Sequence, residues 1–146
     1  MALWQISFFI IPKQELNTGT VLLKGEEGMF DDSVYWTEDY PKFFFDKVND
    51  FLPQGKSWSE NILMFGSESS NVFEVLIEDD KVVSLGFRID FTANYEDVLR
   101  AMIEFCVINS LNILTTDLEI LSLNFEFINS YIQQSPQVIL FHNLLS

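Results

Sequence analysis

Residues 81–91 show the strictest alternation of apolar and polar side chains in the chain. Alternation with a period of two indicates a β-strand that buries one face and exposes the other. The sequence therefore predicts an antiparallel strand here, with one face in the core. The apolar face is Val83, Leu85, Phe87, Ile89 and Phe91, and the polar face is Ser84, Gly86, Arg88 and Asp90.

Other segments extend this pattern into a sheet. Residues 3–11 alternate in the same way and end at Pro12, so they predict a further strand. Residues 61–65 and 71–78 directly precede the strand of residues 81–91, and together the three segments predict an antiparallel meander. Residues 111–121 are consistent with either a strand or a loop.

The turn after residue 78 determines the register of the meander. A two-residue turn of Asp79 and Asp80 sets Ile77 opposite Val82, whereas a three-residue turn sets Ile77 opposite Val83. We favour the three-residue turn, because only that register keeps every apolar side chain on one face. It also pairs Val75 with Leu85 and Phe73 with Phe87.

Three segments have the spacing of apolar residues that is typical of helices. Pro41 suits the first turn of a helix that runs to Leu52, Asn94 caps a second helix, and residues 124–134 form a third. Residues 138–145 are too apolar to stay exposed, so we expect them to dock on the core. Strands followed by helices, without β-α-β alternation, predict an α+β fold. We expect an antiparallel sheet of four or five strands with about three helices packed on its apolar face.

The composition is that of a folded protein with a strongly acidic surface. Apolar residues make up 48% of the chain, which predicts a single globular domain over residues 1–146. The net charge of −14 repels phosphates and anionic lipids, so we expect neither nucleic acid nor a membrane as a partner. This charge favours a basic protein instead. Cys106 is the lone cysteine, which indicates a reducing, cytoplasmic location.

Few residues of the chain suit catalysis. The one histidine, His142, lies among apolar residues, and Cys106 has no basic neighbour of the kind that activates a thiol. No segment has the alternating oxygen ligands and glycine of a calcium loop. We therefore expect no cofactor, no metal site and no catalytic residue. An alternative is a small carboxylate-dependent or metal-dependent hydrolase assisted by His142.

The polar face of the predicted hairpin is the first candidate binding site. In the favoured register Glu74 lies opposite Gly86 and diagonal to Arg88, and Asp90 lies two residues beyond Arg88. These three charged side chains are placed to interact across the strands. Gly86 leaves a shallow depression that suits a side chain of a partner. We predict Glu74, Arg88 and Asp90 as binding residues, with an ordinary exposed sheet face as the alternative.

Acidic and aromatic residues before the first helix form the second candidate. Tyrosine and tryptophan beside acids are common at binding surfaces. We predict that Asp31, Asp32, Trp36 and Asp39 belong to such a surface. Core packing is the alternative explanation for the aromatic residues of this group. The other exposed aromatic candidates are Tyr35, Tyr40 and Trp58.

The layout resembles the small acidic immunity proteins of bacterial toxin systems. The resemblance rests on size, acidity, an antiparallel sheet with helices, and the run Phe87-Arg88-Ile89-Asp90 before a helix. It implies an inhibitor that acts by binding, and it assigns a role to no residue. We predict a non-enzymatic protein-binding module, either an inhibitor of the immunity type or an adaptor. The alternatives are the hydrolase and a homo-oligomeric structural subunit. The high phenylalanine count and the apolar tail are consistent with a homodimer.

Overall fold

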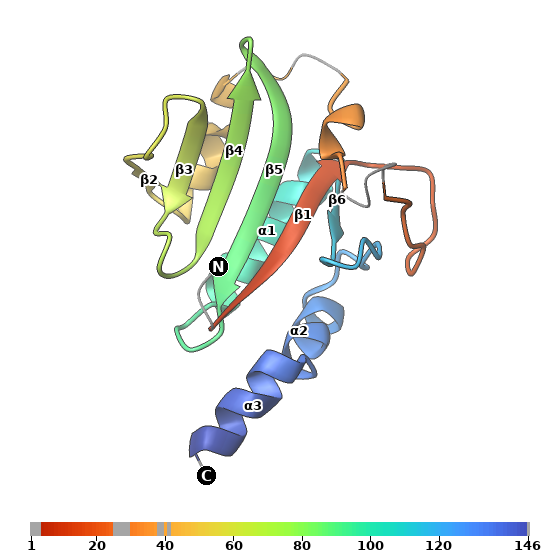
Figure 1. The fold of residues 1–146 in the computed structure, drawn as a ribbon, viewed down its shortest axis with the longest axis vertical. Helices are drawn as coiled ribbons and strands as arrows, with labels where there is room; N and C mark the ends of the chain where they lie inside the picture. The colour runs from red at the N-terminus through yellow and green to blue at the C-terminus, as the bar shows by residue number, and fades with distance from the viewer. Residues whose placement is uncertain (1–3, 25–29, 38–39, 41, 146) are drawn as a thin grey trace.

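The computed structural model describes residues 4–24, 30–37, 40 and 42–145, and an antiparallel sheet lies at its centre (Figure 1). Within these residues the sheet has six strands in the order β2-β3-β4-β5-β1-β6. The predicted α+β class is confirmed, with six strands in place of the four or five expected. The strands are β1 (Gln5–Pro12), β2 (Gln54–Gly55), β3 (Ile62–Gly66), β4 (Val72–Glu78), β5 (Lys81–Asp90) and β6 (Leu111–Leu114).

The two edge strands account for the difference in strand number. β2 is only two residues long and directly follows the segment predicted as a helix up to Leu52. β6 is the start of residues 111–121, which the sequence left open between strand and loop; all four of its residues are buried, so burial does not alternate along it. Both strands are short, and both become recognisable only through their pairing with β3 and β1.

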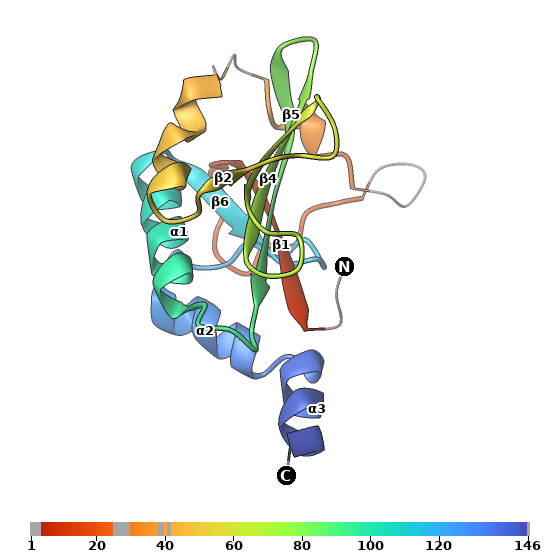
Figure 2. The same ribbon diagram turned by 90° about the vertical axis from the view of Figure 1, so that its left-hand side faces the viewer.

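The helices lie mainly on one face of the sheet. The helices are η1 (Asp32–Val34), η2 (Lys42–Asp50), α1 (Glu96–Ile108), α2 (Phe125–Gln133) and α3 (Pro136–Leu145). Figure 2 shows the sheet edge-on, with η2, α1 and α2 on the left, η1 on the right and α3 below the sheet. The predicted helix before Leu52 is a 3₁₀ helix, and its buried residues Phe45 and Val48 are three positions apart, as suits that geometry.

The β4–β5 turn differs from the favoured prediction. Asp79 and Asp80 have φ angles of 52° and 62°, so the turn has two residues and Ile77 pairs with Val82. A two-residue turn with both residues at positive φ matches the twist of antiparallel strands, which explains why it forms. A bulge at Val83 then shifts the register by one residue. Beyond the bulge the predicted pairs Val75–Leu85 and Phe73–Phe87 are confirmed.

The main core lies between the sheet and the helices. Its centre is a group of phenylalanine rings, in which Phe73 of β4 lies 6.0 Å from Phe45 and 6.1 Å from Phe105, measured between ring centroids. A smaller core lies on the opposite, outer face of the sheet, over β1 and β6. There the described residues of the segments 13–24 and 30–35 cover the sheet. The smaller core is formed by Ile11, Leu114 and Ile120, with Phe9, Leu22, Phe30 and Tyr35 packed against it.

The last described segment forms a helix that is only partly docked. Residues 138–145 were expected to pack on the core, but of α3 only Val138 is buried. The remainder of α3 projects past the lower end of the sheet (Figure 1). No helix in the described part of the chain is both long enough and apolar enough to cross a bilayer.

Candidate functional site

The outer face of the sheet over β3, β4 and β5 is partly exposed in the described structure. Residues 13–24 and 30–35 pack on β1 and β6, and η1 reaches β5 at Ser84, whereas Gly86 and its neighbours on β3 to β5 are half-buried (Figure 2). We call this surface the open face. It contains a hollow of about 200 Å³, and Gly86 forms part of its lining. A Cβ atom added at Gly86 would have only the Phe8 carbonyl oxygen nearby, at 4.0 Å. The hollow is therefore space that any larger residue at position 86 would fill. Its lining residues are Ile62, Glu74, Leu76, Ser84 and Gly86.

Glu74, one of the residues that line the hollow, forms an ion pair with the neighbouring strand. Glu74 lies directly opposite Gly86, as predicted, and Arg88 donates from Nη2 to Oε1 of Glu74. The side chains of Arg88 and Glu74 are 21% and 27% exposed, so the pair is partly shielded from water. An ion pair at this exposure contributes at most about 1 kcal/mol to folding. Its main effect is to hold the Glu74 carboxylate at the rim of the hollow.

Ser84, another residue that lines the hollow, is held in place by a buried carboxylate. Asp32 of η1 is 9% exposed and accepts a hydrogen bond of 2.6 Å from the Ser84 hydroxyl. Burial raises the pKa of Asp32 above its ordinary value of 3.8, and the hydrogen bond from Ser84 opposes this shift. Asp31 is exposed and caps η1 by accepting from the backbone N–H of Ser33 at 3.1 Å. The hydrogen bond between Asp32 and Ser84 thus attaches η1 to β5 at the border of the open face.

The raised pKa of Asp32 predicts a specific pH dependence. The folded protein binds this proton more tightly than the unfolded chain does, so the contribution of Asp32 to stability falls as the pH rises from 3.8 through the raised pKa. Asp32→Asn keeps an acceptor for Ser84 and removes the buried charge. We expect this variant to be more stable than wild type at pH 7 in urea unfolding, with the difference shrinking as the pH falls through the raised pKa towards 3.8.

Asp31→Asn is the matched control for this measurement. It removes the same charge from the adjacent exposed position, and asparagine caps helices as well as aspartate does. An equal gain in both variants would trace the effect to net charge instead of burial. A loss of stability in Asp32→Asn at pH 7 would contradict the prediction.

The remaining predicted residues do not join the hollow. The Asp90 carboxylate accepts from the backbone N–H of Thr92 at 2.9 Å and from its hydroxyl, so it closes the turn after β5. Trp36 was expected to be exposed but is only 5% exposed, since the chain passes into the main core after Tyr35. Its ring packs edge-on against Tyr40 at 5.1 Å. Asp39 lies outside the residues that the structure describes.

The sequence reasoning missed the apolar part of the site. Ile62 and Leu76 line the hollow, and neither was named as a candidate. Leu76 is two residues from Glu74 in β4, so both side chains point to the same face of the sheet. This spacing could have identified Leu76 from the sequence. Ile62 is paired with Leu76 across β3 and β4, which no sequence pattern marked. The lining of the hollow therefore combines two apolar side chains with one carboxylate.

Other groups that carry chemistry lie apart from the open face. Cys106 is fully buried on α1, and burial raises the pKa of its thiol far above the ordinary value, which keeps it protonated. His142 is exposed on α3. Among the described residues, no group of three or more histidine, cysteine, aspartate and glutamate side chains is placed to hold a metal ion.

A larger cavity of about 390 Å³ lies beside α2 and contains none of the predicted residues. Tyr131 lines it, and burial together with the charges of Asp117 and Glu119 raises the pKa of this tyrosine. Gln134 and Gln137 contribute polar side chains to its lining. The open face differs from this cavity in that a predicted binding residue, Glu74, lines its hollow.

The chain matches no protein-family model, no curated protein and no solved structure. Its function is therefore argued from the chemistry of the open face.

Proposed function

We propose that this protein is a non-enzymatic binding module, an inhibitor or adaptor of the immunity type, that docks a basic protein on its open face. The observation that carries the proposal is the hollow at Gly86 beside the Glu74 carboxylate. The residues that line the hollow are half-buried among the described residues, so it opens on the surface of the sheet. A recess on an otherwise flat sheet is a place where one side chain of a partner anchors a complex.

The lining of the hollow favours a lysine or arginine side chain from the partner. Such a side chain has an apolar stem and a charged end, and it can pack its stem on apolar surface while its charge stays solvated. Ile62 and Leu76 offer the apolar surface, and Glu74 offers the carboxylate. Arg88 uses Oε1 of Glu74, whereas a carboxylate accepts up to about four hydrogen bonds. Glu74 therefore has capacity for a second cation.

The net charge of the chain supports the same class of partner. A charge of −14 attracts basic proteins and speeds their association, and this attraction weakens as salt screens it. Charge alone does not select one surface, because acidic residues are spread over the whole chain. The hollow supplies the specific contact, and the overall charge supplies the attraction.

Gly86→Val tests the proposal, because it fills the hollow from an open position on the strand. The measurement is affinity capture with the tagged full chain from an extract of the source cells, washed at low and then high salt, with quantitative mass spectrometry of the eluates. We expect a basic protein that wild type retains at low salt and releases at high salt. We expect Gly86→Val to capture at least about tenfold less of this protein than wild type does, because the variant loses one anchoring contact.

Thr116→Val is the matched control. It introduces the same side chain at an exposed position in the loop after β6, away from the open face. The control is expected to capture as wild type does. Equal capture by Gly86→Val and Thr116→Val would refute the open face as the docking site. Clean eluates from wild type at both salt concentrations would count against the binding module itself.

A further inference from the structure

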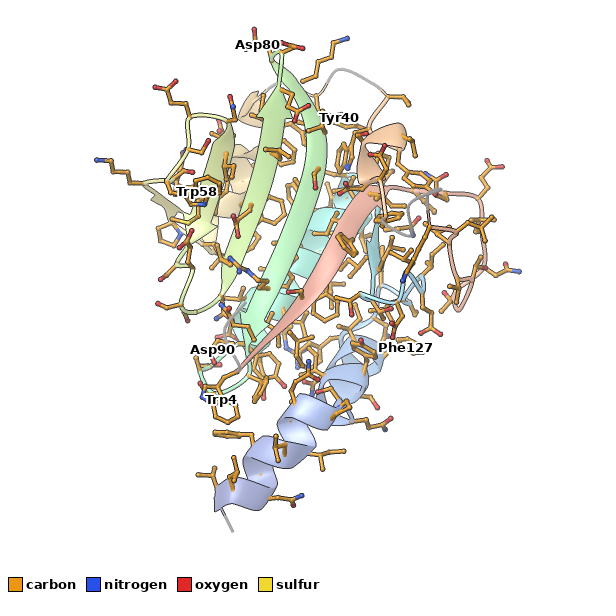
Figure 3. All side chains as sticks on the ribbon, in the orientation of Figure 1. Trp4, Tyr40, Trp58, Asp80, Asp90 and Phe127 are labelled. Atoms are coloured by element: carbon orange, nitrogen blue, oxygen red, sulfur yellow. The ribbon has the colours of Figure 1, made fainter. Side chains whose placement is uncertain are left out.

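Two cavities adjoin each other along α2, away from the open face. The larger, of about 390 Å³, lies between α2, β1 and the turn after β6, and the smaller, of about 220 Å³, lies nearer the beginning of α2. Tyr131 and Gln134 line both cavities. Figure 3 labels Phe127, which lines the smaller cavity, beside α2 on the right of the molecule. We call the two cavities together the α2 groove.

The charged side chains of the α2 groove are acidic. Asp117 lines the larger cavity and Glu119 lines the smaller one, and no lysine, arginine or histidine is among the described residues that line either cavity. In the described part of the chain neither carboxylate is paired with a lysine or arginine. Gln134 donates from Nε2 to the Ser130 hydroxyl at 3.1 Å, a bond that does not use its carbonyl oxygen. The groove therefore offers hydrogen-bond acceptors and negative charge.

Tyr131 lies within the electrostatic field of both carboxylates. Burial raises the pKa of Tyr131, and the charges of Asp117 and Glu119 raise it further. A field that disfavours the negative tyrosinate favours a positive charge at the same place. The face of the tyrosine ring adds a weaker attraction for a cation that lies against it. One positively charged ligand that enters the groove thus interacts with both carboxylates.

The α2 groove also contains apolar surface between its polar groups. Ile6 and Pro136 line the larger cavity, and Leu121 and Phe127 line the smaller one. Apolar surface next to hydrogen-bonding groups is typical of sites that bind small organic molecules. A ligand that fits this lining has methylene groups as well as positive charge.

We propose that the α2 groove binds a free aliphatic polyamine, a flexible chain of methylene groups that carries several ammonium groups. An alkylammonium group donates up to three hydrogen bonds and accepts none, which matches the carboxylates and the amide oxygen. The methylene groups match the apolar part of the lining. A carboxylate in each of two adjoining cavities suits two charges on one chain, whereas a lysine side chain of a protein has only one.

Other classes of ligand fit this lining less well. An anion would meet two carboxylates and no basic side chain among the described lining residues. A metal ion needs more ligands of its own kind, and the described residues contain no group of three or more histidine, cysteine, aspartate and glutamate side chains placed to hold one. The net charge of −14 draws polyamines towards the protein in general, and the groove supplies the specific contacts.

The test is isothermal titration calorimetry of spermidine with the full chain at low salt. We expect one spermidine to bind per chain with a dissociation constant of about 0.1 mM, and we expect binding to weaken as salt is added. Asp117→Asn and Glu119→Gln each remove one carboxylate and nearly preserve its shape. Each variant is expected to bind spermidine about tenfold more weakly, because it loses one charge-assisted hydrogen bond.

Asp46→Asn is the matched control, because Asp46 is exposed on η2 and lines neither cavity. It removes the same charge and is expected to bind spermidine as wild type does. Gly86→Val is also expected to bind spermidine normally, which separates the α2 groove from the open face. Far-UV circular dichroism checks that all variants are folded.

Several results would overturn the proposal. One is the absence of binding up to about 10 mM spermidine, a hundred times the expected dissociation constant. Another is an equal loss in Asp46→Asn and Asp117→Asn, which would trace the binding to net charge. Unchanged binding in Asp117→Asn and Glu119→Gln, or a loss confined to Gly86→Val, would place the amine elsewhere. Binding of N-acetyl-lysine amide as tight as that of spermidine would favour a single lysine side chain of a partner instead.

Discussion

Gly66→Ala is expected to lower the free energy of unfolding by about 2–4 kcal/mol, a large part of the 5–15 kcal/mol typical of such chains. Gly66 ends β3 with a φ angle of 91°, a backbone conformation that residues with a side chain rarely adopt. A Cβ atom there would also meet the backbone carbonyl oxygen of Asn71, well inside contact distance. Backbone atoms in a paired strand cannot move aside as a side chain can, so the strain has no easy relief.

The consequences of this strain extend to the sheet around the open face. The connection that follows Gly66 accepts a hydrogen bond of 2.9 Å from the Gln5 side chain of β1 at the carbonyl of Glu68. Asn71 accepts one of 2.8 Å from the backbone N–H of Asp90 in β5. A shift of this connection would disturb both strands. We therefore expect Gly66→Ala to distort the open face as well as to lower the free energy of unfolding.

Gly86→Ala is the matched control for Gly66→Ala, because it makes the same replacement in the same sheet. Gly86 has open space at its Cβ position, and alanine in a strand interior is about 0.5–1 kcal/mol more favourable than glycine. We expect urea unfolding to show a small gain for Gly86→Ala and a large loss for Gly66→Ala. Similar effects of the two variants would show that the end of β3 is not held in the conformation described.

Phe73→Ala is expected to cost about 3–5 kcal/mol, the usual range for a buried phenylalanine. Phe73 is fully buried at the centre of the main core, with the rings of Phe45, Phe65 and Phe105 within 6.1 Å of its own. Its removal leaves a cavity that these rings, fixed on β3, η2 and α1, can fill only in part. Urea unfolding followed by circular dichroism measures the loss, and the slope of the transition shows whether the native state stays compact.

Phe127→Ala is the corresponding control on the surface. Phe127 of α2 is 45% exposed and lies at the side of the molecule (Figure 3), so its removal is expected to change stability by about 0.5 kcal/mol or less. A cost below about 1.5 kcal/mol for Phe73→Ala would mean that the phenylalanine cluster packs more loosely than the structure shows.

The alternation of side chains was sufficient to predict much of the sheet and one part of the candidate site. Period-two alternation is a local property, so it identified β1, β4 and β5 and the faces of Leu85 and Phe87. Residues that pair across neighbouring strands have their side chains on the same face of the sheet. The sequence therefore also predicted that Glu74 lies opposite Gly86 and diagonal to Arg88. The acidic net charge is likewise a property of the sequence alone.

Tertiary structure decided the features that depend on contacts between distant segments. Nothing local determines that the described residues of 13–24 and 30–35 pack on β1 and β6, that the outer face around Gly86 stays partly exposed, or that Asp32 reaches Ser84. Trp36 is buried because its segment crosses from one layer to the other, which its acidic neighbours in sequence did not indicate. Even the β4–β5 turn required the twist of the paired strands to choose two residues and a bulge at Val83 over a simpler register. The physical reason is common to all of these: burial and pairing are set by what packs against a segment, and the sequence of that segment alone does not contain this information.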